Sequence, residues 1–154
     1  MQKKKVYISG PDVFAPNARQ LGDSFKIACR DCGFEGLYPL DIDQADITSE
    51  IIFAENLNKI RTADIVVANL NPFRGECIDD GTAYEIGFAH ALKKPVYGYA
   101  NDLRSLRERI GKYDGSGYEV EDFGYPVNLM IAETVSYVVE GDFTDCVRWL
   151  RTVM

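Results

Sequence analysis

Four short apolar runs, separated by longer segments, dominate the hydrophobic pattern of this chain. They are KVYISG (5–10), GLYPL (36–40), ADIVVANL (63–70) and KKPVYGYA (93–100). Nearly continuous apolar runs of this length are typical of strands that are buried on both faces of a sheet. We therefore predict four strands, with the third and fourth runs at the centre of the sheet.

The segments between these runs carry apolar residues at spacings of three and four, which predicts helices. Helices are expected over residues 17–34, 47–63, 81–93, 101–110 and 143–154, with Val147 and Leu150 facing inward in the last, and residues 112–126 are expected to be irregular. Strands that alternate with helices favour a parallel sheet. The prediction is a single α/β domain over residues 1–154, with a doubly wound, flavodoxin-like or Rossmann-like parallel sheet of about five strands and helices on both faces.

Composition and charge exclude several classes of protein. The net charge of −7 and the pI near 4.7 repel phosphate backbones, so nucleic acid is not an expected partner. No window of about 20 apolar residues could span a bilayer, so no membrane association is expected. The basic start MQKKK leads into glycine and prolines instead of the apolar core of a secretory signal. The expected location is the cytoplasm.

Common catalytic and cofactor motifs are missing from the sequence. Neither G-x-G-x-x-G after a strand nor G-x-x-x-x-G-K-[ST] occurs, and the one histidine, His90, makes a serine or cysteine triad improbable. Cys29 and Cys32 form a C-x2-C pair that lacks the second pair of a zinc site. We expect neither a metal nor an organic cofactor, so the remaining candidates for chemistry are carboxylates.

Ligands of open α/β sheets bind beyond the carboxyl ends of the strands, near the point where the strand order reverses. Three loops should meet there: ISGPDVFAP (8–16), residues 39–43 and ANLNPFRGECIDD (68–80). Each of them is rich in polar or conformationally special residues. We therefore expect the site at this edge of the sheet.

One charged residue, Glu85, stands inside the apolar segment from Gly81 to Leu92. Helical spacing places it on one side with Gly81, Phe88, Ala89 and Leu92, and Asp79 or Asp80 is suited to cap the helix. Desolvation would raise the pKa of Glu85, whereas the helix start would favour its ionised form. A partly buried carboxylate suits a nucleophile that attacks an electron-poor carbon. The alternative is that Glu85 complements the helix dipole and both aspartates only cap.

Three motifs resemble the nucleoside 2-deoxyribosyltransferase family: VYISGPDVF (6–14), NPFRGECIDDGTAYEIGFAHAL (71–92) and GYPVNLM (124–130). The similarity runs from the first strand to about residue 135. It implies a retaining glycosyl transfer, as in nucleotide salvage, between 2'-deoxynucleosides and free nucleobases. An enzyme carboxylate attacks the anomeric carbon, the base leaves, and a second base takes the sugar. No metal or organic cofactor is required.

The resemblance also assigns roles to individual residues. Glu85 matches the nucleophile and Tyr7 the tyrosine that holds it, while Asp79 matches the aspartate that binds sugar hydroxyls and is a candidate for proton transfer. Gly10, Pro11 and Phe14 match the loop that lines the pocket. Asn128, with Met130, matches a residue that the family donates across a subunit interface, which implies a homo-oligomer, a dimer or larger.

Other positions depart from the family pattern or align less securely with it. Asn56 stands where some members carry an aspartate, and an amide can orient a base but cannot be a general acid. Protonation of the departing base is therefore left to Asp79, Asp41 or water. Asp41 is our candidate for base contact, and Arg74 and Gly75 are expected to shape the rim of the pocket.

Two other functions remain alternatives at this point. The first is a hydrolase that cleaves 2'-deoxynucleoside 5'-monophosphates, although the loop GPDVFAP is acidic and apolar where a phosphate pocket would need basic or hydroxyl groups. The second is a non-catalytic module that senses nucleosides. The sequence leaves open whether purines alone or both purines and pyrimidines are accepted, the size of the oligomer and the balance of transfer and hydrolysis.

Overall fold

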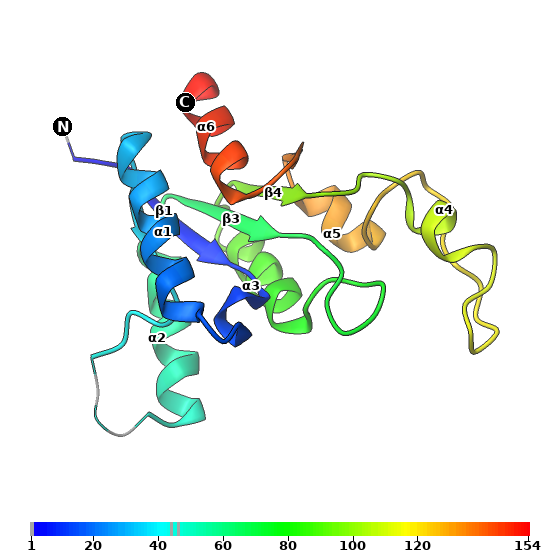
Figure 1. Ribbon diagram of the computed structural model, residues 1–154, viewed down its shortest axis with the longest axis horizontal. Helices are drawn as coiled ribbons and strands as arrows, with labels where there is room; N and C mark the ends of the chain where they lie inside the picture. The colour runs from blue at the N-terminus through cyan, green and yellow to red at the C-terminus, as the bar shows by residue number, and fades with distance from the viewer. Residues whose placement is uncertain (1, 44, 46) are drawn as a thin grey trace.

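A five-stranded parallel sheet forms the centre of the computed structural model, which describes residues 2–43, 45 and 47–154 (Figure 1). The strands are β1 (Lys5–Ser9), β2 (Glu35–Leu37), β3 (Ile65–Asn69), β4 (Val96–Ala100) and β5 (Tyr137–Glu140). They are arranged in the order β2-β1-β3-β4-β5, and every neighbouring pair is parallel. The chain reverses its direction of travel across the sheet between β1 and β3, so the carboxyl ends of these two strands form the switch point.

Helices cover both faces of the sheet, which confirms the predicted doubly wound α/β fold. They are the short 3-10 helix η1 (Pro11–Phe14) and the α-helices α1 (Ala18–Asp31), α2 (Ser49–Thr62), α3 (Asp80–Ala91), α4 (Leu106–Ile110), α5 (Leu129–Thr134) and α6 (Phe143–Val153). α1 and α6 pack on one face, while α2, α3 and α5 lie on the other (Figure 1). β1 alternates between the two cores, with Val6 and Ile8 in one and Tyr7 in the other.

Three elements, η1, β5 and α5, were not predicted, and a fourth, α4, is shorter than predicted. β5 is a four-residue edge strand and α5 has only six residues, so neither is long enough for a clear hydrophobic period. α4 covers five residues instead of the expected 101–110. It starts late because Asp102 accepts a hydrogen bond from the backbone of Arg104, and Ser105 then caps the helix.

The predicted inward face of α3 is partly wrong. Thr82, Ile86 and Ala89 are its buried residues, whereas Leu92 is exposed and Glu85 lies at the edge of the buried face. Apolar and small residues occur on all sides of α3, so several faces fit the spacing rule equally well. Val147 and Leu150 of α6 are buried as expected. Leu57 and Ile60 of α2 are also buried, whereas Ile47 and Ala54 are exposed.

Residues 103–127, which we call the arm, extend away from the sheet and contain α4 (Figure 1). Tyr113, Tyr118 and Phe123 of the arm are exposed. A single isolated bridge joins Tyr113 to Glu119. The arm therefore presents aromatic side chains that the chain itself does not bury.

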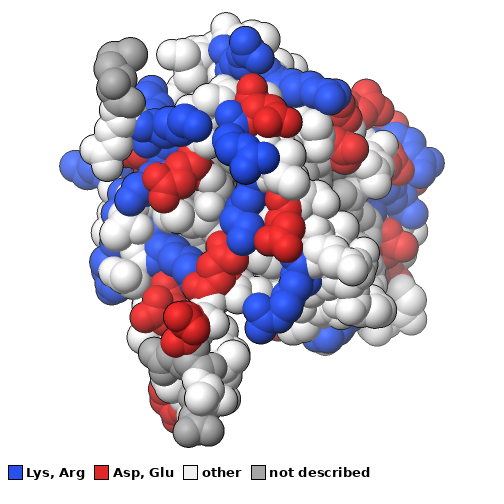
Figure 2. Space-filling view, turned by 60° about the vertical axis from the view of Figure 1, so that its left-hand side comes forward, with Lys and Arg blue, Asp and Glu red and all other residues white. Residues whose placement is uncertain are grey.

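Charged side chains of both signs are interspersed over the face shown in Figure 2. On α1, for example, Lys26 lies 3.2 Å from Asp23 and 2.7 Å from Asp41. In the described part of the chain, no helix is both long and apolar enough to cross a bilayer.

Candidate active site

The loops after β1 and β3 meet at the switch point of the sheet. A Cβ atom on Gly10 would lie only 2.8 Å from the Cβ of Asn69, so this close approach requires glycine. Asn69 Nδ2 donates to Asp12 Oδ2 at 3.1 Å, and the backbone N–H of Asn71 donates to Asn69 Oδ1 at 3.0 Å. These contacts hold both loops against the ends of their strands.

The Glu85 carboxylate lies above the end of β1, where two hydroxyl groups bind it. The hydroxyl of Tyr7 donates to Oε2, and Ser9 Oγ donates to Oε1 at 3.3 Å. Tyr7 and Ser9 are two residues apart on β1, so the pleat points both side chains to the same face of the sheet. Each oxygen of the carboxylate therefore has its own donor from one strand.

The pKa of Glu85 is raised from its ordinary value of 4.5 to about 7, and desolvation is the main cause. The two hydroxyl groups partly offset this rise because they stabilise the ionised form, while the negative charge of Asp79 adds to it. Burial, and then the negative charge of Glu85, raise the pKa of Tyr7, which therefore remains a hydrogen-bond donor. Desolvation thus outweighs the two hydrogen bonds, and a large part of Glu85 is ionised near neutral pH.

Asp79 is the N-cap of α3, as the sequence allowed, and it is only 7% exposed. Its Oδ2 accepts from the backbone N–H of Thr82 at 2.9 Å and from Thr82 Oγ1 at 3.0 Å. Oδ1 accepts no hydrogen bond from any described residue. Capping therefore uses one oxygen of the carboxylate, and the other is available to a ligand.

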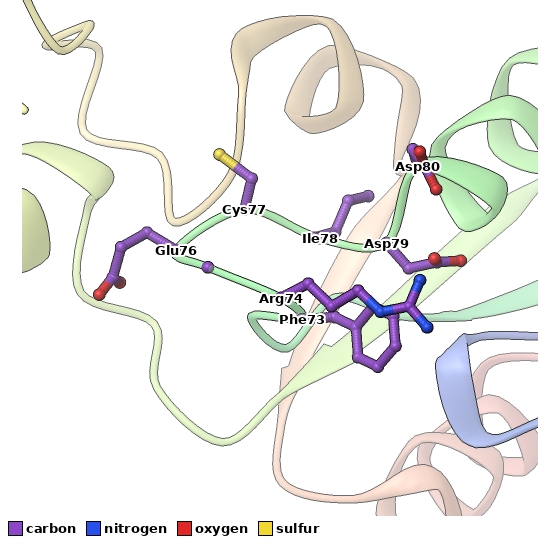
Figure 3. A pocket seen from close by; sticks show the side chains of 8 residues that line it. Phe73, Arg74, Glu76, Cys77, Ile78, Asp79 and Asp80 are labelled. Carbon is purple, nitrogen blue, oxygen red and sulfur yellow. The ribbon is translucent and has the colours of Figure 1, made fainter. Parts of the chain in front are cut away.

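A pocket of about 340 Å³ lies inside the loop before α3 (Figure 3). Its lining residues are Phe73, Arg74, Gly75, Glu76, Cys77, Ile78, Asp79 and Asp80. In Figure 3 the guanidinium of Arg74 and the carboxylate of Asp79 point to the same side of the loop, and Cys77 points away from them. The pocket thus joins Asp79 to the Arg74–Gly75 turn.

An aromatic and cationic stack forms the rim of this pocket. The rings of Phe14 and Phe73 are stacked with centroids 5.6 Å apart, and the Arg74 guanidinium lies 5.0 Å and 4.7 Å from them. Arg74 has a left-handed backbone with φ of 52°, and φ of 132° at Gly75 favours glycine. The sharp turn therefore places the guanidinium over the loop that follows β1.

A second hollow, of about 450 Å³, lies between α2 and α3 and reaches Glu85. Its lining residues are Ser49, Ile52, Phe53, Asn56, Leu57, Gly81, Tyr84 and Glu85. The rings of Phe53 and Tyr84 are 6.0 Å apart. The buried Oδ1 of Asn56 has no hydrogen-bond partner among the described residues. An apolar groove with a few polar groups is suited to a flat heterocycle.

A family model for nucleoside 2-deoxyribosyltransferases matches residues 6–130. The chain belongs to this family. The solved structure of a 2-desoxiribosyltransferase from Leishmania mexicana is similar along 97% of each chain, with 31% identity and a TM-score of 0.86. A 2-deoxyribosyltransferase from Bacillus psychrosaccharolyticus covers 92% of this chain and 88% of its own, with 22% identity and a TM-score of 0.59, so it shows the fold alone.

One further sequence and one further structure are similar to this chain. An uncharacterized protein of Schizosaccharomyces pombe is 35% identical over 117 residues, which are 70% of this chain and 55% of that protein. The chain therefore spans about half the length of that relative. A CMP N-glycosidase from Clostridium botulinum is similar along 97% of this chain and 99% of its own, with a TM-score of 0.58 and 14% identity. The same fold therefore occurs in proteins named as 2-deoxyribosyltransferases and in a protein named as a CMP N-glycosidase.

Within this fold, several of the predicted site residues come together, whereas Asp41, Asn128 and Met130 lie elsewhere. Tyr7 bonds to Glu85, Asn56 lines the same groove, and Asp79 lies beside them. Asp41 instead accepts from Lys26 Nζ at 2.7 Å and from the backbone N–H of Tyr38 at 3.2 Å, in a turn after β2. Its proposed contact with the base remains a prediction.

Asn128 and Met130 lie at the start of α5, outside the lining of the two hollows. Asn128 Oδ1 caps the helix through the backbone N–H of Met130, and its Nδ2 donates to Glu121 at 2.9 Å. The side chain of Met130 is 69% exposed. Both residues thus lie at the surface of the chain.

Two polar contacts of the site were missed from sequence. Ser9 was read only as the end of a strand, although a hydroxyl two residues after Tyr7 must share its face. Asn69 appeared as the last polar residue of an apolar strand, and its pairing with Asp12 across the loops has no local sequence signal. The alternation of side chains between the two faces of β1 indicates the position of Ser9, but no such pattern indicates the pairing of Asn69 with Asp12.

Proposed function

We propose that the protein transfers the 2-deoxyribosyl group between the nucleobases of 2'-deoxynucleosides, through a covalent ester with Glu85. The observation that carries this proposal is the carboxylate held by Tyr7 and Ser9 at the end of the apolar groove. Its pKa near 7 leaves much of it ionised at neutral pH, as a nucleophile requires. Family membership supports the same chemistry.

The geometry suggests where each part of the substrate binds. The base occupies the groove between α2 and α3, with Phe53 and Tyr84 beside its ring and Asn56 at its polar edge. The sugar lies between Glu85 and Asp79, whose Oδ1 accepts from a sugar hydroxyl. The Phe14, Phe73 and Arg74 stack closes the side of the site opposite the groove.

The reaction has two displacements. In the first, a carboxylate oxygen of Glu85 forms a bond to the anomeric carbon and the bond to the base breaks; the departing base keeps the electron pair of that bond and takes up a proton from water. In the second, the nitrogen of a new base attacks the same carbon and loses its proton to water, and the electron pair of the ester bond returns to Glu85. Two inversions retain the configuration. The absence of a 2'-hydroxyl eases formation of the oxocarbenium-like transition state, so one carboxylate suffices.

We further propose that the active form is a homo-oligomer in which Asn128 and Met130 reach a neighbour's sugar. Their exposure and the fixed orientation of Asn128 support this assignment. The exposed aromatic residues of the arm lie in the preceding segment of the chain, where they are available to a second copy.

Incubation with deoxyinosine and adenine tests the reaction. Formation of deoxyadenosine is the expected result, and liquid chromatography separates it from free deoxyribose. Free sugar without deoxyadenosine would favour a hydrolase, and a strong preference for 5'-monophosphates would favour the N-glycosidase reaction named for the Clostridium botulinum relative. Mass spectrometry with a slow 2'-fluoro deoxynucleoside should detect a glycosyl adduct on Glu85. Binding without an adduct would favour a sensing module.

A further inference from the structure

Ser9 is a buried polar residue in a strand that is otherwise suited to apolar side chains. It is 1% exposed, follows Ile8 and pairs in register with Ala68 of β3. A hydroxyl group buried without a partner is unfavourable, so its partner indicates why it is there. Among the described residues, Glu85 Oε1 is the only acceptor recorded for Ser9 Oγ.

The two oxygens of the Glu85 carboxylate are not equivalent. Oε2 accepts from the Tyr7 hydroxyl. Oε1 accepts from Ser9 Oγ at 3.3 Å, which is longer than the roughly 2.7–2.8 Å usual for a hydroxyl donor. A long hydrogen bond restricts the lone pair of its acceptor only weakly. Oε1 is therefore the oxygen whose electrons are more available for attack.

We propose that Ser9 is a positioning residue that presents Oε1 of Glu85 as the attacking oxygen while Tyr7 holds Oε2. This inference rests on the proposed transfer reaction and adds a role for each carboxylate oxygen. Ser9 acts through Glu85 and needs no contact with the substrate. The neutral hydroxyl orients the carboxylate without neutralising its charge.

The bond changes give Ser9 a different importance in the two displacements. When the Oε1 lone pair bonds to the anomeric carbon, Oε1 becomes the ester oxygen and Oε2 becomes the carbonyl oxygen that accepts from Tyr7. When the second base attacks, the electron pair of the ester bond returns to Oε1. Negative charge then develops beside Ser9, whose hydroxyl stabilises it. Loss of this hydroxyl should slow the second displacement more than the first.

Few charged groups act on Glu85, so a change in its pKa when Ser9 is replaced can be attributed to the lost hydroxyl. Tyr7 of β1 and Asp79 before α3 are the titratable groups that act on it. On α2, Lys59 Nζ donates to the backbone of Pro39 and Arg61 lies over the Phe88 ring. On α5, Glu133 accepts from the Tyr125 hydroxyl.

Ser9→Ala is the first test, with transfer between deoxyinosine and adenine as the assay. Without one donor to the ionised carboxylate, the acidic limb of the kcat/KM profile should move up by about 0.5 pH unit. The value of kcat should fall about tenfold, equivalent to one lost hydrogen bond to a developing charge. Mass spectra of samples quenched during turnover should show a several-fold larger fraction of glycosylated Glu85, because the ester accumulates.

Ser9→Cys is the second variant, since it keeps the shape of the side chain and has a weaker donor. It should change all three quantities in the same direction as Ser9→Ala, and it replaces Ser9→Ala if that variant does not fold. Ser24→Ala is the matched control, because the Ser24 hydroxyl donates to Gln20 O on the exposed surface of α1. The control should match the wild type in all three measurements.

The outcomes separate this inference from the function on which it rests. An unchanged acidic limb together with an unchanged adduct fraction, in a variant that folds, would overturn the role of Ser9. A lower kcat with no change in the limb or the adduct would also overturn it, because a purely structural defect would act in that way. If the wild type forms neither adduct nor exchanged nucleoside, the proposed function itself is wrong.

Discussion

The region around Glu85 and the arm are built in opposite ways. Around Glu85, a single strand, β1, supplies two buried hydroxyl groups that already bond to the carboxylate. In the arm, aromatic side chains are exposed, and the Asn128 that follows it is oriented by Glu121 within the same surface segment. The comparison teaches that this chain holds Glu85, the proposed nucleophile, with its own residues, whereas Asn128, a predicted sugar contact, lies at the surface.

The largest expected effect is that of Glu85→Gln. Removal of the nucleophile should lower kcat by about 10⁴-fold and abolish the adduct. Glu35→Gln, at an exposed site on β2, is the matched control and should retain full activity. Substantial activity in Glu85→Gln would mean that Glu85 is not the nucleophile.

The stability of Glu85→Gln should depend on pH differently from that of the wild type. Because the folded protein raises the pKa of Glu85 from 4.5 to about 7, the protonated form is favoured by folding. This contribution is fully present below pH 4.5 and is lost as the pH rises through 7. We compare the free energy of unfolding of Glu85→Gln with that of the wild type by chemical denaturation. The variant minus wild-type difference should be roughly 1–3 kcal/mol larger at pH 8 than at pH 4. An equal difference at both pH values would contradict the assigned cause.

Tyr7→Phe should have the next largest effect. Its hydroxyl lowers the pKa of Glu85, so its removal should move the acidic limb of kcat/KM to higher pH. Activity at pH 7 should fall about 10²-fold, with partial recovery as the pH rises. Tyr137→Phe, an exposed tyrosine on β5, serves as the control. A uniform loss at every pH would show that Tyr7 supports packing instead of the charge of Glu85.

Asn128→Ala tests the predicted sugar contact at the surface. The expected loss in kcat/KM is about tenfold. Mixing this variant with inactive Glu85→Gln should restore part of the activity after the subunits exchange, because one of the mixed sites contains both residues. Light scattering and exchange of a labelled subunit provide the necessary check on assembly. Demonstrated exchange without recovery would place Asn128 and Glu85 in the same subunit's site.

Asp41→Asn should have the smallest effect. Its carboxylate is bonded to Lys26 at the surface, so its loss should cost under about 1 kcal/mol of stability and change kcat/KM less than about threefold. The substrate panel should include all four common deoxynucleosides. A loss above tenfold that is confined to one class of base would instead support the contact with the base that the family resemblance implies.

The sequence was most informative where one residue contrasts with its surroundings. Four strands and the long helices follow from hydrophobic period, and Glu85 stood out as a charge within an apolar segment. The buried face of α3 could not be predicted, because apolar and small residues occur on all sides of that helix. The bond between Ser9 and Glu85 and that between Asp12 and Asn69 join distant segments, so they depend on how β1, β3 and α3 pack.

The position of both hydroxyl donors on β1 makes catalysis depend on strand alignment. A shift of one residue along β1 would turn Tyr7 and Ser9 to the α1 side of the sheet and leave Glu85 with neither hydroxyl. A misaligned chain that remained folded and soluble would therefore show no activity in the transfer assay. Turnover per molecule can thus measure the fraction of correctly registered protein in circularly permuted or redesigned versions, where circular dichroism would report only the content of helix and strand.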